Sequence, residues 1–278
     1  MKKFTLVILL LSLFSVKADF DFDFDFDWFD DMFVWNGNYD ELMDLQKTIP
    51  VENGMSLIVD NFNGSIKIDT WQEDSVYVHV MIRATDEEEF EKVKIEADVD
   101  DNSVFVKSKR LKKNVRASIS YELKVPPYIR IDKLSTNNGA IDVSKINNDV
   151  KAETSNGAIS LTEIDGVVSA STSNGTITVR KCRSVKELDT SNGKIVCEVY
   201  EIERDITLDT SNGSISLGLA QNVDVDLDLD TSNGSISIDD LDVDYITKKK
   251  TYVKATIGRG GNRIIADTSN GSIRVYRL

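Results

Sequence analysis

The apolar and polar positions of the chain are organised around an Asn-Gly pair that recurs along it. Ten of the fifteen glycines follow an asparagine. Eight of these pairs share a common context, with glycine at positions 64, 139, 157, 175, 193, 213, 234 and 271. From position 139 the glycines are separated by 18, 18, 18, 20, 21 and 37 residues. Self-similarity at a nearly fixed period indicates a repeat architecture.

Each repeat alternates apolar and polar residues on both sides of its Asn-Gly pair. Position +2 after the glycine is always Ile, position +4 is apolar or Cys, and position −5 is apolar. Position −3 is Thr in every repeat but the first. This alternation predicts two half-buried β-strands per repeat. The +2 residues are Ile66, Ile141, Ile159, Ile177, Ile195, Ile215, Ile236 and Ile273, and the −3 threonines are Thr136, Thr154, Thr172, Thr190, Thr210, Thr231 and Thr268.

The two strands of a repeat are out of phase, because positions −5 and +2 differ by an odd number. One straight strand would place those two apolar residues on opposite faces. The backbone is therefore expected to turn at Asn-Gly, a pair whose members both tolerate positive φ.

Two folds fit this turn. A two-residue hairpin would pair position −3 with +2 and position −5 with +4. A β-solenoid would make each repeat one coil and place Asn-Gly at a corner. Only the solenoid explains why Thr, Ser and Ile recur at fixed offsets, since like residues then stack ~4.8 Å apart. We therefore predict an all-β chain: a right-handed parallel β-helix or β-solenoid with coils of about 18–21 residues, preceded by an irregular β region.

The repeats also carry a family resemblance. The stretch 56–68, SLIVDNFNGSIKI, resembles the opening unit of the "putative adhesin" family of bacterial β-strand-repeat proteins. Members of this family carry recurring Thr-Ser-Asn-Gly-x-Ile units after a signal peptide and have no known function. The stretches 121–126, YELKVP, and 136–141, TNNGAI, resemble its central segment. The resemblance covers residues 51–278 and implies a parallel β-helix-like fold. The adhesin label rests on analogy, because a fold does not fix a function.

Outside the regular repeats, further strands are expected at 76–82, 93–99, 104–107 and 115–125, with a charged connection at 86–91. We expect this region to cap the stack and so to protect a sheet edge. The long interval before the last Asn-Gly predicts a hairpin or an irregular coil at 245–265.

The N-terminal residues have the layout of a secretory signal peptide cut after Ala18. A basic start precedes the apolar run 4–14, and small residues occupy the two positions that a signal peptidase reads. Eleven apolar residues span only ~17 Å as a helix, less than the ~30 Å of a bilayer core, so cleavage is favoured over anchoring. No Cys directly follows the run, which argues against a lipid-modified N-terminal Cys.

Residues 19–31 hold seven Asp, five Phe and one Trp, mostly in alternation. They are either a disordered acidic tail or a segment that adds to an exposed sheet edge, of the same protein or of a partner. A short helix is expected at 38–47. The resulting division is a signal peptide at 1–18, a tail with a short helix or linker at 19–50, an N-terminal β region at 51–130, and repeats at 131–278.

The composition narrows the function classes. The net charge is −14, and loss of Lys2, Lys3 and Lys17 with the signal peptide makes it −17. Phosphates would be repelled, so a nucleic-acid binder is not the default reading. No later apolar stretch reaches the ~20 residues of a transmembrane span.

Few residues offer chemistry. His79, the only His, is read as a surface strand residue and not as a base. Asp189, Asp209 and Asp230 at position −4 are expected to form an outward ladder about 5 Å apart, which is either a weak Ca²⁺ site or sugar-binding edge, or a solvated face that hydrogen-bonds turn amides. Cys182 and Cys197 lie about three positions out of register, ~10 Å along a strand, which favours two buried thiols over a disulfide.

Two further features are read as structural. The Gly-rich run 258–261 has no helix after it, so it is interpreted as a turn and not as a phosphate loop. The hydroxyls at position −2 could face carbohydrate or ice, or could be there because small polar residues stack well at a corner. They belong to Ser155, Ser173, Ser191, Ser211, Ser232 and Ser269.

The sequence therefore predicts no catalytic, cofactor-binding or metal-binding residues and a non-enzymatic structural or adhesive role. The protein is expected in the periplasm or at the cell surface, with a carbohydrate or an envelope protein as partner. The alternatives are a periplasmic partner in envelope maintenance or stress sensing, and a polysaccharide-binding or polysaccharide-degrading β-helix protein. The ligand, the oligomeric state, the side of an outer membrane and the role of residues 19–31 stay open.

Overall fold

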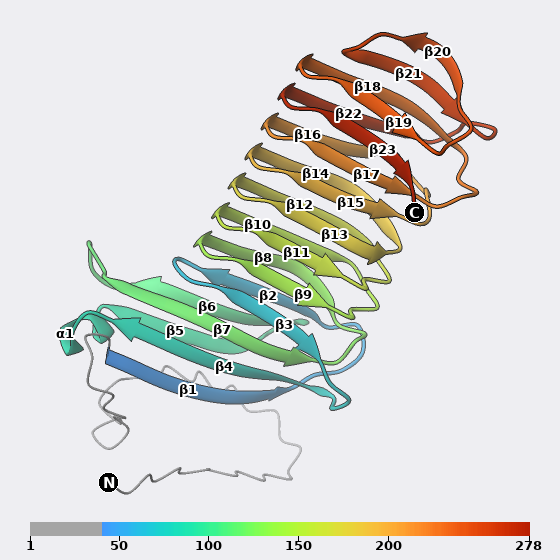
Figure 1. Cartoon of the computed structure of the whole chain (residues 1–278). Coiled ribbons are helices and arrows are strands. Elements are labelled where there is room, and N and C mark those ends of the chain that lie inside the picture. The colour runs from blue at the N-terminus through green and yellow to red at the C-terminus, as the bar shows by residue number, and fades with distance from the viewer. Residues whose placement is uncertain (1–40) are drawn as a thin grey trace, which may run out of the picture.

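The computed structural model describes residues 41–278, which form an all-β body of two large mixed sheets (Figure 1). The first sheet runs, in spatial order, β1 (Glu41–Pro50), β4 (Ser75–Ala84), β7 (Ala117–Val125), β3 (Ile66–Thr70), β9 (Ile141–Ser144), β11 (Ile159–Thr162), β13 (Ile177–Cys182), β15 (Ile195–Val199), β17 (Ile215–Leu219), β23 (Ile273–Arg277) and β19 (Ile236–Asp239). The second runs β20 (Asp244–Lys248), β21 (Tyr252–Ile257), β18 (Val225–Asn233), β22 (Arg263–Asn270), β16 (Ile206–Asn212), β14 (Ser184–Asn192), β12 (Val167–Asn174), β10 (Val150–Asn156), β8 (Arg130–Asn138), β2 (Ser56–Asn61), β6 (Ser103–Arg110) and β5 (Val93–Asp100).

The signal peptide at 1–18 and the Asp/Phe segment at 19–31 lie outside the described residues. Within residues 41–278 the one helix is α1 (Glu87–Phe90), in the predicted charged connection, with the Asp86 side chain accepting from the Glu89 amide at its start. None of the helical structure in this range is long and apolar enough to cross a membrane.

The chain changes sheet at each of the eight Asn-Gly pairs of the repeats, so the hairpin alternative is wrong for the repeats. β10 in the second sheet pairs with β8 and β12, whereas β11, which follows it directly, pairs with β9 and β13 in the first. The pairing is parallel and in register: Thr154 lies between Thr136 and Thr172. Each repeat unit therefore adds one strand to each sheet, and equivalent residues form rows along the stack (Figure 1).

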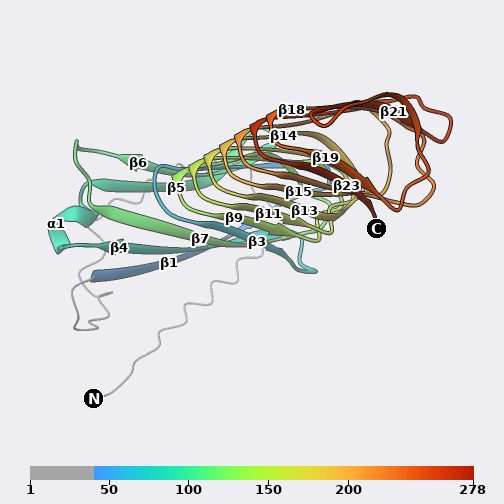
Figure 2. The ribbon, with the colours of Figure 1, turned by 45° about the horizontal axis from the view of Figure 1, so that its top comes forward.

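The core lies between the two sheets, which face one another as layers (Figure 2). In seven of the eight units the +2 and +4 residues are no more than 2% exposed, as in Ile195 and Cys197 at 0%. Burying one such aliphatic side chain stabilises the fold by ~1.5–3 kcal/mol, so these rows carry much of the stability.

The last repeat unit does not lie at the end of the stack. β22 and β23 pair on one side with β16 and β17 and on the other with β18 and β19. The predicted hairpin at 245–265 is present as β20 and β21, and β21 pairs antiparallel with the far side of β18. Because β21 covers that side of β18, β22 pairs with the other side of β18. The last unit therefore lies between the units of β16 and β18, which are consecutive in sequence.

The N-terminal region departs from the parallel repeat, as predicted, although each of its strands is itself regular. The four predicted strands correspond to β4, β5, β6 and β7, with β4 antiparallel to β7 and β5 antiparallel to β6. Strict alternation of buried residues, as in Val76, Val78, Val80 and Ile82 of β4, explains the regularity.

The helix predicted at 38–47 is also wrong over its described part, which belongs to strand β1. The strand pairs antiparallel with β4, and Met43, Leu45 and Ile49 are buried. These three residues follow a two-residue period, whereas the helix expectation rested on Leu42 and Leu45. Tertiary pairing with β4 decides between the two patterns.

Candidate functional site

The corner at which each unit changes sheet carries a continuous row of asparagine side chains. Each amide Nδ2 donates to the Oδ1 of the neighbouring unit's asparagine, over 2.8–3.0 Å for all six links. Together with the serine that precedes every asparagine of the row except Asn138, we call this row the ladder edge. In spatial order its asparagines are Asn138, Asn156, Asn174, Asn192, Asn212, Asn270 and Asn233.

Threonines hold the same corner from inside. The buried Thr190 Oγ1 donates to the carbonyl oxygen of Gly175 in the preceding unit, over 3.0 Å. All seven position −3 threonines make this contact with a neighbouring unit, at 2.7–3.1 Å. In the first unit Asn61 replaces Thr, and its Nδ2 donates to the carbonyls of Gly64 and Ile119. The recurring Thr therefore satisfies a backbone carbonyl at the turn.

Glycine is required at the corner for space, and the expected reliance on positive φ is wrong for seven of the eight turns. Among the turn glycines only Gly64 has a positive φ. A Cβ placed on Gly175 would instead collide with the backbone carbonyl of Gly157, one unit away. The same collision recurs along the row, because in-register stacking brings successive turn backbones into contact.

The ladder edge keeps hydrogen-bonding capacity for a ligand. A primary amide has two N–H donors and two acceptor lone pairs. A link to each neighbour uses one of each, so an interior asparagine such as Asn192 retains one donor and one lone pair. The adjacent Ser173, Ser191 and Ser211 side chains are exposed. The edge therefore presents amides and hydroxyls at the ~4.8 Å repeat of the strands.

The carboxylates at position −4 form a row of four, in a different order from the one expected. Asp189 is opposite Asp209, but Asp209 is opposite Asp267, and Asp230 follows Asp267. The expected contact between Asp209 and Asp230 is wrong, because the last repeat unit lies between them.

This carboxylate row is electrostatically unfavourable. Partial burial, followed by the neighbouring Asp209 and Glu187, raises the pKa of Asp189. Partial burial, followed by Asp209 and Asp230, raises the pKa of Asp267. Among residues 41–278, none of the four accepts a hydrogen bond from a turn amide, and no group of His, Cys, Asp and Glu side chains converges as metal ligands do.

We expect Asp267→Asn to stabilise the protein at pH 7. A raised folded pKa means that stability falls as pH rises through it, and the penalty is fully present at neutral pH. Removing the charge of Asp267 from between those of Asp209 and Asp230 should raise the free energy of unfolding by ~0.5–1 kcal/mol. The gain should vanish near pH 3, where the carboxylates are protonated, and should shrink in 1 M salt.

Urea unfolding of both proteins at pH 7 and pH 3 measures this effect. Asp142→Asn is the matched control, because Asp142 lies between Lys67 and Ser160 in register and should not gain stability. A destabilised Asp267→Asn protein at pH 7 would contradict the interpretation of the row, and a loss of Ca²⁺-dependent stabilisation in it would reveal a cation site.

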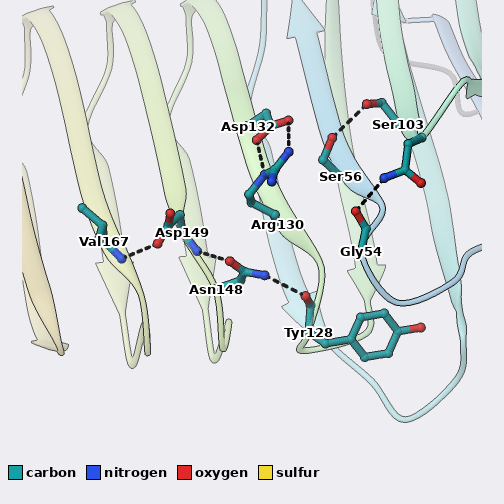
Figure 3. A network of polar contacts seen from close by, with 10 residues as sticks. Gly54, Ser56, Ser103, Tyr128, Arg130, Asp132, Asn148, Asp149 and Val167 are labelled. Carbon is teal, nitrogen blue, oxygen red and sulfur yellow. Dashed lines mark hydrogen bonds and ion pairs between the residues drawn. The ribbon is translucent and has the colours of Figure 1, made fainter.

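The opposite corner of the units carries a polar network and a shallow depression. Asn148 donates to the Tyr128 carbonyl, and Asp149 Oδ1 accepts from the Val167 amide over 2.8 Å (Figure 3). Further along, Arg183 contacts Glu201 at 3.2 Å and Glu203 at 2.9 Å beside a depression that Tyr200 also lines. These charges pair within the protein, so the corner serves to link units.

His79 has neighbours that the sequence did not reveal. Its Nε2 lies 2.8 Å from Asp44 Oδ1 on β1, and its Nδ1 lies 3.5 Å from Glu122 Oε2 on β7. It is therefore a surface strand residue, as predicted, but it links three strands through carboxylates from both sides. Only the antiparallel register of β1, β4 and β7 brings these residues together.

Both cysteines are free and buried. Burial raises the pKa of Cys182 to about 11 and also raises that of Cys197. Since the thiolate is the reactive form, we expect no reaction of the folded protein with Ellman's reagent at pH 8 and two thiols per chain after denaturation without reductant. Fewer than two would indicate a disulfide.

The Gly-rich run is a turn, as predicted. It connects β21 to β22, with positive φ at Gly258, Gly260 and Gly261. The intervening Arg259 donates from its backbone amide and its guanidinium to Asp224.

Comparisons with known proteins give distant matches. No protein-family model matches the chain, and no curated protein does. Among solved structures, it is similar to a "putative cell adhesion protein" from Clostridium sporogenes, with 13% identity over 86% of this chain and 100% of that one and a TM-score of 0.39. A "putative adhesin" from Bacteroides fragilis matches with 12% identity over 85% and 97% and a TM-score of 0.38. A "putative lipid binding protein" from Parabacteroides distasonis matches with 13% identity over 87% and 98% and a TM-score of 0.35. All three scores are below 0.5, so the functional arguments below rest on this chain's own residues.

Proposed function

We propose that the protein is an exported, non-enzymatic, right-handed β-solenoid with a structural or adhesive role at the cell envelope or surface. The proposal includes the signal peptide at 1–18 and the boundary at residue 130 between the N-terminal β region and the repeats, with residues 41–50 in the N-terminal β region because β1 pairs with β4. One observation carries the functional part: seven units present the same amide, and six of them the same hydroxyl, along one edge.

The ladder edge suits a hydroxyl-rich polymer. Its amides are already held by their neighbours, so binding costs little side-chain entropy. Each interior unit offers the same donor and acceptor at the strand spacing, so a repeating ligand can engage several units at once. Simultaneous weak contacts raise the overall affinity without any single strong one. A surface polysaccharide has this chemistry, and we propose it as the ligand class.

Retention on insoluble polysaccharides tests the ligand class. We expect the triple variant Ser173→Ala, Ser191→Ala, Ser211→Ala to lose most of its retention. The control is Thr178→Ala with Ser216→Ala, which removes hydroxyls from the outer face of the first sheet, where both side chains are partly exposed. Equal retention of both variants would exclude the ladder edge as the binding site.

Protease treatment of intact cells tests the location. Loss of the protein while a periplasmic marker survives would support a surface adhesive role. Survival of both, reversed on lysis, would place the protein in the periplasm and favour the envelope-partner alternative. Capture of an envelope protein that is lost when residues 19–31 are deleted would then support that alternative.

The polysaccharide-degrading alternative has one observation in its favour. Asp189 and Asp209 lie side by side in register on neighbouring parallel strands, and partial burial followed by the charge of Asp209 raises the pKa of Asp189. A retaining glycosidase uses two carboxyl groups about 5–5.5 Å apart, one as the general acid and the other as the nucleophile. New reducing ends that appear with the wild-type protein but not with Asp209→Asn would establish this activity.

A further inference from the structure

One end of the stack leaves its apolar rows uncovered. Ile236 and Ile238 of β19 occupy the +2 and +4 positions, which are buried in every other unit, yet both are partly exposed. β19 is the last strand of the first sheet, so its outer side has no neighbouring strand among the described residues (Figure 1). The core therefore continues to the surface at this point.

More apolar side chains lie at the same end. Leu241 and Val243 are partly buried against the core, and Tyr245 and Ile246 of β20 are 40% and 66% exposed. We call these four residues, with Ile236 and Ile238, the open end. Apolar residues gathered at a sheet edge favour addition of another strand.

Lysines flank the open end. Lys248, Lys249 and Lys250 are exposed, and none forms an ion pair with another described residue. The turn that carries them lies beside the start of β19, where the Ile236 amide donates to the Lys250 carbonyl over 3.0 Å, so the free part of this edge begins after Ile236. Exposed Asp240 and Asp242 lie on the connection between β19 and β20, and exposed Asp244 begins β20, so the three lysines, the lysine rim, are a local cationic segment at an end of mixed charge.

The other end of the body is closed. Met43, Leu45 and Ile49 of β1 are buried, and the Lys47 side chain donates across to the Ala97 carbonyl of β5. The two ends therefore differ, and only one of them offers an uncovered apolar row within residues 41–278.

Residues 19–31 complement the open end in sequence. Extended, their alternation places aromatics on one face and seven carboxylates largely on the other. The aromatic face matches the apolar strip, and the carboxylates match the lysines. We propose that residues 19–31 of one copy add as a strand to β19 at the open end of a second copy, so that the protein assembles head to tail.

The reach of the chain favours a second copy over the same one. The first sheet has eleven strands with β1 and β19 at its two edges, so these lie about 48 Å apart at the usual strand spacing. The ten residues from Asp31 to Glu41 extend at most ~36 Å. A contact between opposite ends of identical molecules is heterologous, and it propagates into an open chain unless a ring closes.

Sedimentation velocity of the chain from Asp19 onward, across concentration at low salt, tests the proposal. We expect assemblies that grow with concentration and dissociate as salt rises. Deleting residues 19–31 should leave monomers, and a synthetic peptide of residues 19–31 should dissolve assemblies of the intact chain. A permuted peptide of the same composition, with its aspartates grouped, should not.

The lysine rim needs its own variant. Lys248→Ser with Lys249→Ser and Lys250→Ser should weaken assembly at least about tenfold, since three attractive charges are lost. Lys112→Ser with Lys113→Ser, exposed in the loop between β6 and β7, is the control and should assemble normally. A circular dichroism spectrum equal to that of the wild type shows that each variant is folded.

Three results would overturn the proposal. The first is a monomeric intact chain at every concentration. The second is assembly that survives deletion of residues 19–31, which would mean that the ends associate without this segment. The third is equal activity of the native and permuted peptides, which would mean that charge alone acts. Polysaccharide binding is measured separately on the ladder edge, so neither outcome there bears on assembly.

Discussion

Replacing Gly175 by alanine is expected to lower the unfolding midpoint by about 6–12 °C, because overpacking costs about 3 kcal/mol at the upper end of its usual range. The added Cβ would collide with the Gly157 carbonyl, which is backbone and cannot rotate away. Relief would require the corner of two units to separate, which would disturb the Thr190 contact with the Gly175 carbonyl and the amide row beside it. Thermal unfolding followed by circular dichroism measures the shift.

Thr176→Ala is the matched control for this variant. The position follows the turn glycine directly, and Ala140 and Ala158 occupy it in two other units. The control should unfold within about 1–2 °C of the wild type, as surface substitutions usually do. Equal midpoints for Gly175→Ala and the wild type would show that successive turns are not in close contact.

Truncation after Asn262 is expected to unfold the whole C-terminal part of the stack, although it removes only sixteen residues. The removed strands β22 and β23 lie between two other units, so β18 and β19 would lose their only unit neighbour. Ile264, Ile273 and Val275 are buried, and each contributes ~1.5–3 kcal/mol to the stability of the fold. Losing all three should therefore lower the free energy of unfolding by about 5–9 kcal/mol.

Hydrogen exchange measures this outcome directly. We expect the amides of 225–257 to lose protection, while those of β10 to β15 keep it. A stack built in simple sequence order would instead keep 225–239 protected on β16 and β17. Removing Leu278 alone is the control and should leave the exchange of 225–239 unchanged.

The sequence predicted the register well, because each row has its own physical requirement. Ile at +2 must be buried, Thr at −3 must reach a carbonyl, and Asn at −1 must reach another Asn. Each requirement repeats with the same period, so one alignment satisfies all three. The strands of the N-terminal region followed from the same alternation.

The order of the units could not be predicted, because all units present nearly the same surface to a neighbour. Nothing in the period indicates that the unit of Thr268 lies between those of Thr210 and Thr231. The hairpin β20–β21 determines this order, because β21 pairs with one side of β18 and leaves only the other side for β22. The carboxylate row was misordered for this reason.

Other features depend on contacts between distant segments. The contacts of His79 with two carboxylates require β1 and β7 on its two sides, and β1 itself is a strand only because β4 pairs with it. The role of the turn glycines was misread because positive φ is a local property, whereas the close approach exists only between stacked units. The open end likewise follows from which unit is last in space.

A cross-linking measurement tests the order and register of the units most directly. Asn212→Cys with Asn270→Cys places two thiols on neighbouring strands about 4.8 Å apart, whereas Asn212→Cys with Asn233→Cys separates them by two strand spacings. The wild-type protein, whose two cysteines are both buried, provides the blank. With a short thiol cross-linker that fluoresces only when both ends react, we predict a strong signal for the 212/270 pair and little for the 212/233 pair. The reverse result would show that the last unit does not lie inside the stack and would contradict this account of the fold.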